Sequence, residues 1–256
     1  LILADDLGET DLGVYGNRYI KTPHLDKFAS EGARWTNAYS AAPVCSPTRA
    51  ALLTGRSTAR VRFTGHITSL HRHRYPEFGR IIPPDDNLSL PATERTLATE
   101  LKARGYKTYH VGKWHLGLTE DSYPQKRGFD INVGGDNHGA PGSYFFPYAD
   151  KSKRVPLEGG APGEYLTDRL TDEAIRLMEN SGDAPFFLYL SHYSVHEFLE
   201  APKERIAEFR GRPNSNPLID PVYGAVVENL DENVGRLMQA VRRLGLDQDT
   251  LVIFMS

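Results

Sequence analysis

Residues 43–55 read PVCSPTRAALLTG, and Cys45 within this stretch is the only cysteine among the 256 residues. Pro47 and the apolar run behind it predict a helix that begins close to Cys45. The amide groups and dipole of a helix N-terminus favour an anion there, so Cys45 is a candidate nucleophile or the precursor of one. The alternative is a small buried thiol that only packs, as free cysteines usually do.

The segment around Cys45 is locally basic. Between Gly32 and Pro76 the sequence has no Asp or Glu. It contains Arg34, Arg49, Arg56, Arg60, Arg62, Arg72 and Arg74, together with His66, His71 and His73. Such a segment attracts an anionic substrate, unless its acidic partners come from elsewhere in the chain. Because it has no lysine and few interleaved aromatics, we do not expect nucleic-acid binding.

The composition is that of an ordinary soluble domain, with 39% hydrophobic and 25% charged residues. The length allows one large or two small domains. No apolar run approaches the roughly 20 residues that span a bilayer, so no membrane span is predicted. Since residues 1–4 already read as a strand, we expect that any targeting segment has been removed. A single cysteine fits the cytosol or a secreted protein without disulfides.

Short apolar runs alternate with helical patterns along the chain. The predicted strands are 1–4, 107–111, 186–190 and 251–255. The predicted helices are 22–30, 96–104, 164–180 and 221–244. This alternation indicates an α/β fold with a mainly parallel or mixed central sheet and helices on both faces. The ligand site is expected at the carboxyl ends of the strands, and the Gly- and Pro-rich residues 134–163 as a loop on that side.

Two acidic residues, Asp5 and Asp6, directly follow the first predicted strand. Adjacent carboxylates repel each other, and a hard cation such as calcium or magnesium relieves that repulsion. A turn or a helix cap is the alternative for such a pair when it is considered alone.

A second group of polar residues follows the predicted strand 107–111. Lys113 and His115 are two residues apart, so in an extended chain they would point to the same side and reach one oxyanion. His196 follows the strand 186–190, and His192 is the competing candidate there.

Four blocks together carry a family resemblance. They are the C-x-P-x-R pattern at Cys45, the opening Asp5-Asp6-Leu7-Gly8, the stretch 105–117 and Ser194-Val195-His196-Glu197. In order and spacing the chain resembles the type I, formylglycine-dependent sulfatases, an arylsulfatase-like family of the alkaline phosphatase-like superfamily. Val195 departs from the proline that commonly precedes the family's histidine. The resemblance implies the fold of a sulfatase N-terminal domain.

The resemblance also implies the nucleophile and the metal. Cys45 would be oxidised to formylglycine by a formylglycine-generating enzyme, and the hydrated aldehyde would attack sulfur. Asp5, Asp6 and the modified Cys45 would hold Ca²⁺, with Mg²⁺ as the alternative. A thiol at position 45 would mean unmodified, inactive protein.

The remaining roles follow from the same resemblance. Arg49 would steady the nucleophile, and Lys113 would neutralise sulfate oxygens. His115 would take the proton that drives collapse of the covalent sulfate ester. His196 would bind sulfate and help protonate the leaving alcohol.

By the same resemblance, residues 1–256 form a catalytic domain that is expected to be truncated at both ends. An Asp-Asn pair of metal ligands, a second active-site lysine and a C-terminal subdomain would lie beyond Ser256. We therefore expect no activity from these 256 residues alone. A periplasmic, secreted or lysosomal location is expected from the family.

The resulting functional hypothesis is a sulfatase that hydrolyses sulfate monoesters, with a sulfated carbohydrate favoured by the basic segment. The alternatives are an aryl sulfatase, a phosphoester or phosphonate monoester hydrolase, and an inactive sugar-binding relative. The expected partners are an anionic small-molecule or carbohydrate sulfate ester and, during maturation, the formylglycine-generating enzyme.

Overall fold

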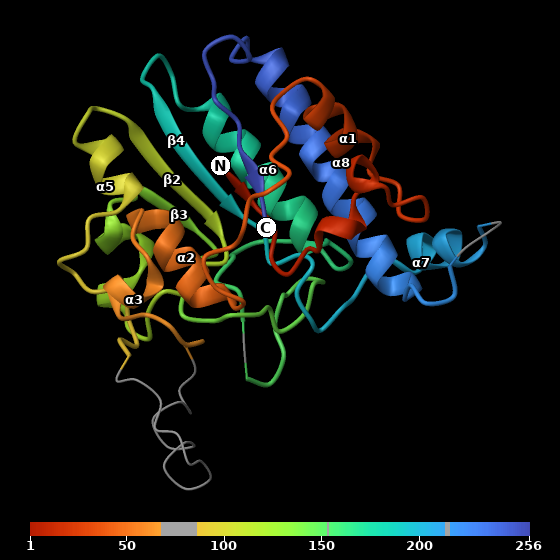
Figure 1. Ribbon diagram of the computed structural model, residues 1–256, viewed down its shortest axis with the longest axis horizontal. Coiled ribbons are helices and arrows are strands. Elements are labelled where there is room, and N and C mark those ends of the chain that lie inside the picture. The colour runs from red at the N-terminus through yellow and green to blue at the C-terminus, as the bar shows by residue number, and fades with distance from the viewer. Residues whose placement is uncertain (68–85, 153, 213–215) are drawn as a thin grey trace, which may run out of the picture.

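The computed structural model describes residues 1–67, 86–152, 154–212 and 216–256. Within these residues five strands form one parallel sheet in the order β3-β2-β4-β1-β5 (Figure 1). The strands are β1 (Ile2–Leu3), β2 (Lys107–Gly112), β3 (Ile131–Val133), β4 (Phe186–Ser191) and β5 (Phe254–Met255). The predicted parallel α/β sheet is confirmed, and β3 is a strand that the sequence patterns did not indicate.

Helices cover both faces of this sheet, as predicted. On one side lie α1 (Pro23–Ser30), α6 (Leu166–Glu179) and α8 (Pro221–Arg243), and on the other α2 (Cys45–Thr54), α3 (Thr58–Val61) and α5 (Leu97–Lys102) (Figure 1). Helix α7 (Lys203–Arg210) packs against α8. Short 3₁₀ turns are η1 (Glu9–Asp11), η2 (Gly13–Tyr15), η3 (Glu120–Ser122) and η4 (Pro124–Arg127).

Two hydrophobic clusters sandwich the sheet because successive strand residues point to opposite faces. In β4, Leu188 and Leu190 join the cluster under α6 and α8. Phe187 and Tyr189 join the cluster on the side of α2 and α5. Burial on both faces explains why this strand is a continuous apolar run with no polar alternation.

The predicted helix boundaries are close to the observed ones where local capping sets them. The Thr96 side chain accepts a hydrogen bond from the backbone N–H of Thr99, which starts α5. Asp220 caps α8 in the same way, with Pro221 at the first helical position. Helix α7 was not predicted because its sequence is largely polar. The predicted strand 251–255 is reduced to its last two residues.

The segment 134–163 forms no helix or strand in its described residues, apart from isolated bridges, which agrees with the predicted loop. Among the helices that the structure describes, none is long and apolar enough to cross a membrane.

Candidate active site

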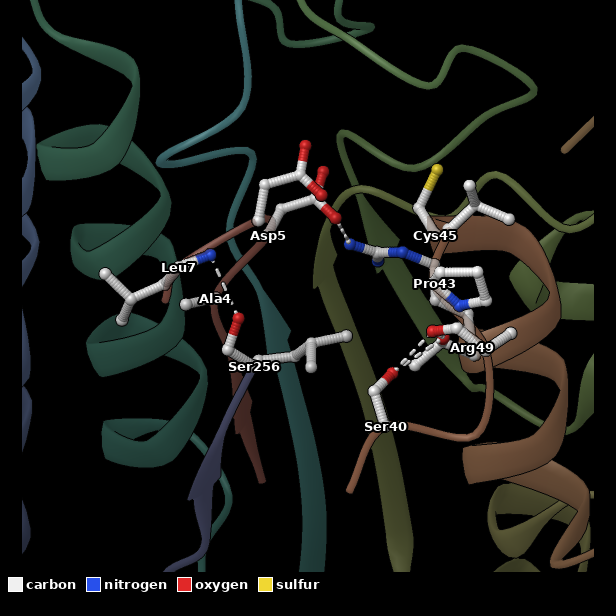
Figure 2. A pocket seen from close by; sticks show the side chains of 13 residues that line it. Ala4, Asp5, Leu7, Ser40, Pro43, Cys45, Arg49 and Ser256 are labelled. Carbon is white, nitrogen blue, oxygen red and sulfur yellow. Dashed lines mark hydrogen bonds and ion pairs between the residues drawn. The ribbon is translucent and has the colours of Figure 1, made fainter. Parts of the chain in front are cut away.

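A pocket of about 220 Å³ lies where β1 and β5 end beside the N-terminus of α2. Asp5, Asp6, Cys45, Arg49 and Ser256 are among its lining residues. Figure 2 shows the Arg49 side chain reaching from α2 toward Asp5, with the Cys45 side chain on the same side of the pocket as α2. Segments far apart in sequence therefore meet at the carboxyl edge of the sheet, where parallel α/β proteins place their ligands.

Cys45 is the first residue of α2, and Gly55, which follows the last helical residue Thr54, has a left-handed conformation with φ 64°. The Sγ of Cys45 lies 3.4 Å from Nδ1 of His115. Burial alone would raise the pKa of the Cys45 thiol, but its hydrogen-bond contact with His115 and the charge of Lys113 lower it to about 7. The side chain at position 45 is therefore held where a negative charge is stabilised.

The orientation of His115 is fixed from its far side. Its Nε2 lies 3.0 Å from the carbonyl oxygen of Ile67. A carbonyl only accepts, so Nε2 carries the proton and Nδ1 is the acceptor that faces Cys45 and the hydroxyl of Ser46 at 3.3 Å. Burial lowers the pKa of His115, which keeps the ring neutral. His115 can thus take a proton at Nδ1.

The backbone around His115 differs from the expected extended chain. Strand β2 ends at Gly112, and His115 has a left-handed conformation with φ 56°. The prediction that an extended strand aligns Lys113 and His115 is therefore wrong. Both side chains reach the surroundings of Cys45 because the chain turns after β2.

Asp5 is the centre of a buried ion cluster. Its carboxylate accepts a hydrogen bond from Arg49 Nη2 at 3.0 Å and pairs with Lys113 Nζ. Burial alone would raise the pKa of Asp5, but Lys113 and Arg49 outweigh it and lower the pKa to about 2. Arg49 Nη1 also donates to the Lys113 carbonyl at 2.8 Å and to the Ser191 hydroxyl. One carboxylate therefore faces two cations, and a second anion would balance them.

Asp6 differs from its neighbour. Its side chain is 57% exposed, and its backbone is left-handed with φ 62°. His196 Nε2 lies 3.7 Å from a carboxylate oxygen of Asp6, so His196 belongs to this edge of the sheet. His192 is buried, and burial lowers its pKa to about 4. Within the described chain neither ring nitrogen of His192 has a hydrogen-bond partner.

Two groups of possible metal donors emerge among the described residues. The donor atoms of Asp5, Asp6 and His196 all lie within 4.8 Å of one another, and so do those of Cys45, His66 and His115. The predicted set of Asp5, Asp6 and Cys45 shares one pocket. The Cys45 thiol nevertheless groups with the histidines, and the carboxylates group with His196.

Sequence reasoning missed three supporting groups. Ser191 lies at the end of β4, and its position directly after a predicted strand was a usable signal. Ser46 follows the cysteine and was read only as part of the motif. The carbonyl of Ile67 had no sequence signal because any residue offers the same backbone oxygen.

The basic segment is less one-sided in three dimensions than in sequence. Arg49 pairs with Asp5, and Arg56 pairs with Glu94 at 2.7 Å, so acidic partners come from elsewhere in the chain. Other members lie outside the described residues, namely Arg72, Arg74, His71 and His73.

The fold and the site define an α/β protein with a charged, anion-complementary pocket at the carboxyl edge of a parallel sheet. The family model Sulfatase matches residues 1–256, and the chain belongs to this family. The predicted family membership is confirmed.

Individual relatives support the same assignment. The chain is 34% identical over 277 residues to N-acetylgalactosamine-6-sulfatase of Rattus norvegicus, covering 100% of the chain and 48% of that protein. It is 31% identical to steryl-sulfatase of Mus musculus, covering 100% and 50%. The crystal structure of Ps i-CgsB in complex with k-i-k-neocarrahexaose is similar, with a TM-score of 0.78 and 30% identity over 99% of this chain and 56% of that one. The chain thus spans about half the length of these curated relatives.

Proposed function

We propose that this chain forms the nucleophile side of a sulfatase active site that hydrolyses sulfate monoesters. Cys45 acts after conversion to formylglycine by the converting enzyme. The observation that carries the proposal is the contact of Cys45 Sγ with His115 Nδ1 at 3.4 Å, in a pocket that also holds Asp5 and Arg49. This contact, in a chain of the Sulfatase family, supports the roles of nucleophile for position 45, base for His115 and anion-binding charge for Arg49.

The residues present fit a hard cation. Asp5 and Asp6 offer carboxylate oxygens, and His196 lies with them within 4.8 Å. When bound, Ca²⁺ would supply Lewis-acid stabilisation of negative charge on oxygen. Calcium takes about 6 to 8 oxygen ligands, so groups besides these two carboxylates are needed. Ser256 accepts a hydrogen bond from the Leu7 N–H at 3.0 Å, so residues that follow β5 would adjoin this site.

We assign the proton transfers to the histidines. The Ile67 carbonyl accepts a hydrogen bond from Nε2–H of His115. The unprotonated Nδ1 can therefore accept the proton of the hydroxyl at position 45. His196 lies beside the exposed Asp6, where it can bind sulfate and give a proton to the leaving alcohol. Their separation lets one act as base and the other as acid.

Charge stabilisation falls to Arg49 and Lys113. Both contact Asp5, which fixes their positions before substrate arrives and limits the reorganisation needed during reaction. Because two cations share one carboxylate, residual positive charge remains for sulfate oxygens. Arg49 acts mainly by donating hydrogen bonds to Asp5 and to the Lys113 carbonyl. The positive charge of Lys113 stabilises negative charge on the side chain at position 45.

A sulfated carbohydrate is the proposed substrate class. N-acetylgalactosamine-6-sulfatase and a structure in complex with neocarrahexaose among the relatives support a sugar, whereas the steryl-sulfatase relative supports an aryl or steryl ester as the alternative. A lysosomal, secreted or periplasmic location belongs to the same proposal and is supported by the family resemblance.

The deciding experiment combines a mass measurement with a pair of substrates. Full-length protein is expressed with a formylglycine-generating enzyme, and the mass of the peptide that contains Cys45 is measured by mass spectrometry. We expect conversion of the thiol to an aldehyde and faster turnover of an aryl sulfate than of the matched aryl phosphate. The Cys45→Ala variant is the inactive control.

Three results would contradict the proposal. They are an unconverted thiol in protein that still releases sulfate, a large preference for phosphate, and sugar binding by converted protein without any sulfate release. The second result would favour a phosphoester or phosphonate hydrolase, and the third an inactive sugar-binding relative.

A further inference from the structure

A second donor cluster includes the candidate nucleophile and neither Asp5 nor Asp6. It consists of Cys45, His66 and His115, which we call the thiol triad. One sulfur and two imidazole nitrogens lie within 4.8 Å of one another. Thiolate and imidazole are softer donors than the carboxylates, and this is the set that zinc prefers in proteins.

The separation of two of these donors already matches a zinc site. Zinc bonds of about 2.3 Å to sulfur and about 2.0 to 2.1 Å to nitrogen, at a tetrahedral angle, put the two ligand atoms about 3.6 Å apart. The observed distance between Cys45 Sγ and His115 Nδ1 is 3.4 Å. These two atoms can therefore bind one ion without movement of the backbone.

The surroundings of His115 are those of a metal-bound histidine. A ligating imidazole commonly donates its other ring N–H to a carbonyl or carboxylate, which fixes the tautomer and ring direction. The Nε2 of His115 does this to the Ile67 carbonyl at 3.0 Å, leaving the Nδ1 lone pair toward Cys45. A Cβ at Gly139 would come within 2.4 Å of the His115 ring, so the backbone packs against that ring and limits its rotation.

His66 completes the triad from the loop after α3. Its ring centroid lies 4.8 Å from that of His115, at an interplanar angle of 71°. The residue is half-buried, and its donor nitrogen lies within 4.8 Å of the other two donor atoms. Three protein ligands leave a fourth tetrahedral position for water or an anion.

We propose that the protein with an unmodified Cys45 thiol binds one Zn²⁺ through Cys45, His66 and His115. Binding releases the thiol proton to solvent and forms a zinc–thiolate bond, with no change of oxidation state. This soft-metal site is separate from the carboxylate site at Asp5 and Asp6. It exists only in the thiol form, because replacing sulfur by oxygen removes the soft ligand.

The test uses full-length protein expressed without a converting enzyme, with the thiol confirmed by intact mass. Zn²⁺ is titrated in competition with a chromophoric chelator, and Co²⁺ serves as the spectroscopic probe. We expect one zinc per chain and a thiolate-to-cobalt charge-transfer band in the near ultraviolet. Excess Ca²⁺ should not displace the zinc.

Variants separate the triad from the neighbouring groups. His66→Gln should weaken zinc binding by more than the roughly 10- to 100-fold typical of losing an outer-shell partner. His138→Gln, a nearby histidine outside the triad, and Asp6→Asn should leave the zinc affinity unchanged. Protein converted to formylglycine should show no sulfur-to-cobalt band.

The cobalt spectrum is recorded on the wild-type thiol form, so it tests the metal site even if one of the variants does not fold. A missing charge-transfer band, zinc affinity that survives in His66→Gln, or zinc affinity that falls in Asp6→Asn would each overturn the proposal. None of these results bears on the sulfatase activity of converted protein, so the two proposals fail separately.

Discussion

Asp5 and Asp6 are neighbours in sequence and opposites in environment. The Asp5 side chain is 6% exposed and pairs with Arg49 and Lys113. The Asp6 side chain is 57% exposed, and its ion-pair partner among the described residues is His196 at 3.7 Å. The backbone of Asp6 is left-handed, with φ 62°, so the chain changes direction directly after the buried Asp5. One carboxylate therefore organises charge in the interior, and the other is free to bind a ligand.

The two carboxylates therefore differ in how much they contribute to stability, although both belong to the proposed metal site. Removing the buried carboxylate takes away the anion that pairs with buried Arg49 and Lys113, whereas removing the exposed one leaves no buried cation uncompensated. Four substitutions or conditions test this contrast, from the largest expected change in the free energy of unfolding to the smallest.

The largest effect is expected from Asp5→Asn. Breaking a buried ion pair by removing one partner typically costs about 3 to 5 kcal/mol, so urea unfolding should show a loss of that size. The double variant Asp5→Asn with Lys113→Met also removes the buried positive charge of Lys113, so it should recover part of the lost free energy of unfolding. If Asp5→Asn unfolds at the same urea concentration as the wild type, the ion cluster does not stabilise the fold.

Acid should remove most of the same contribution. The pKa of Asp5 is about 2 in the folded protein and 3.8 ordinarily, so its stabilisation is present above about pH 4 and is lost as the pH falls toward 2. The loss amounts to about 2 kcal/mol. Unfolding measured from pH 5 to pH 2 should show it in the wild type, and the Asp5→Asn variant should lack this component. Parallel pH curves for the two proteins would contradict the assignment.

Asp6→Asn should change the free energy of unfolding by no more than about 0.5 kcal/mol, because the side chain is exposed. Calcium affinity, followed by calorimetry on full-length protein, should nevertheless fall, since a ligating charge is lost. Unchanged calcium binding together with full activity would remove Asp6 from the metal site.

The smallest effect on stability is expected for His196→Gln, because the described contacts of this ring are a long one to Asp6 and a local one to the backbone carbonyl of the next residue, Glu197. Turnover by converted full-length protein should fall by about 10² to 10⁴, the usual contribution of a general acid. Substrates with a better leaving group should lose less. An equal loss for all leaving groups would contradict the role of His196 as the acid.

The fold could be predicted well because its signals are local. The apolar runs that became β2 and β4, and the capped helix that became α8, carry periodicities and end signals within a few residues. Strand β3 has three residues and follows no long apolar run, so pairing with β2 decides its structure.

The site could be predicted by residue and less well by role. The polar residues after each strand were found because carboxyl ends of parallel strands share one edge. The expected alignment of Lys113 with His115 failed because the chain leaves the strand conformation at Gly112. Grouping Cys45 with His66 required knowing how the loop after α3 returns to α2.

By itself, the sequence determined the alternation of strands and helices, the helix that begins at Cys45 and the family to which the chain belongs. Only the tertiary structure decided which carboxylate is buried, which nitrogen of His115 carries the proton and which histidine stands at the site. The physical reason is distance along the chain: Asp5 contacts residues 44 and 108 positions away, and the protonation of each group depends on such contacts.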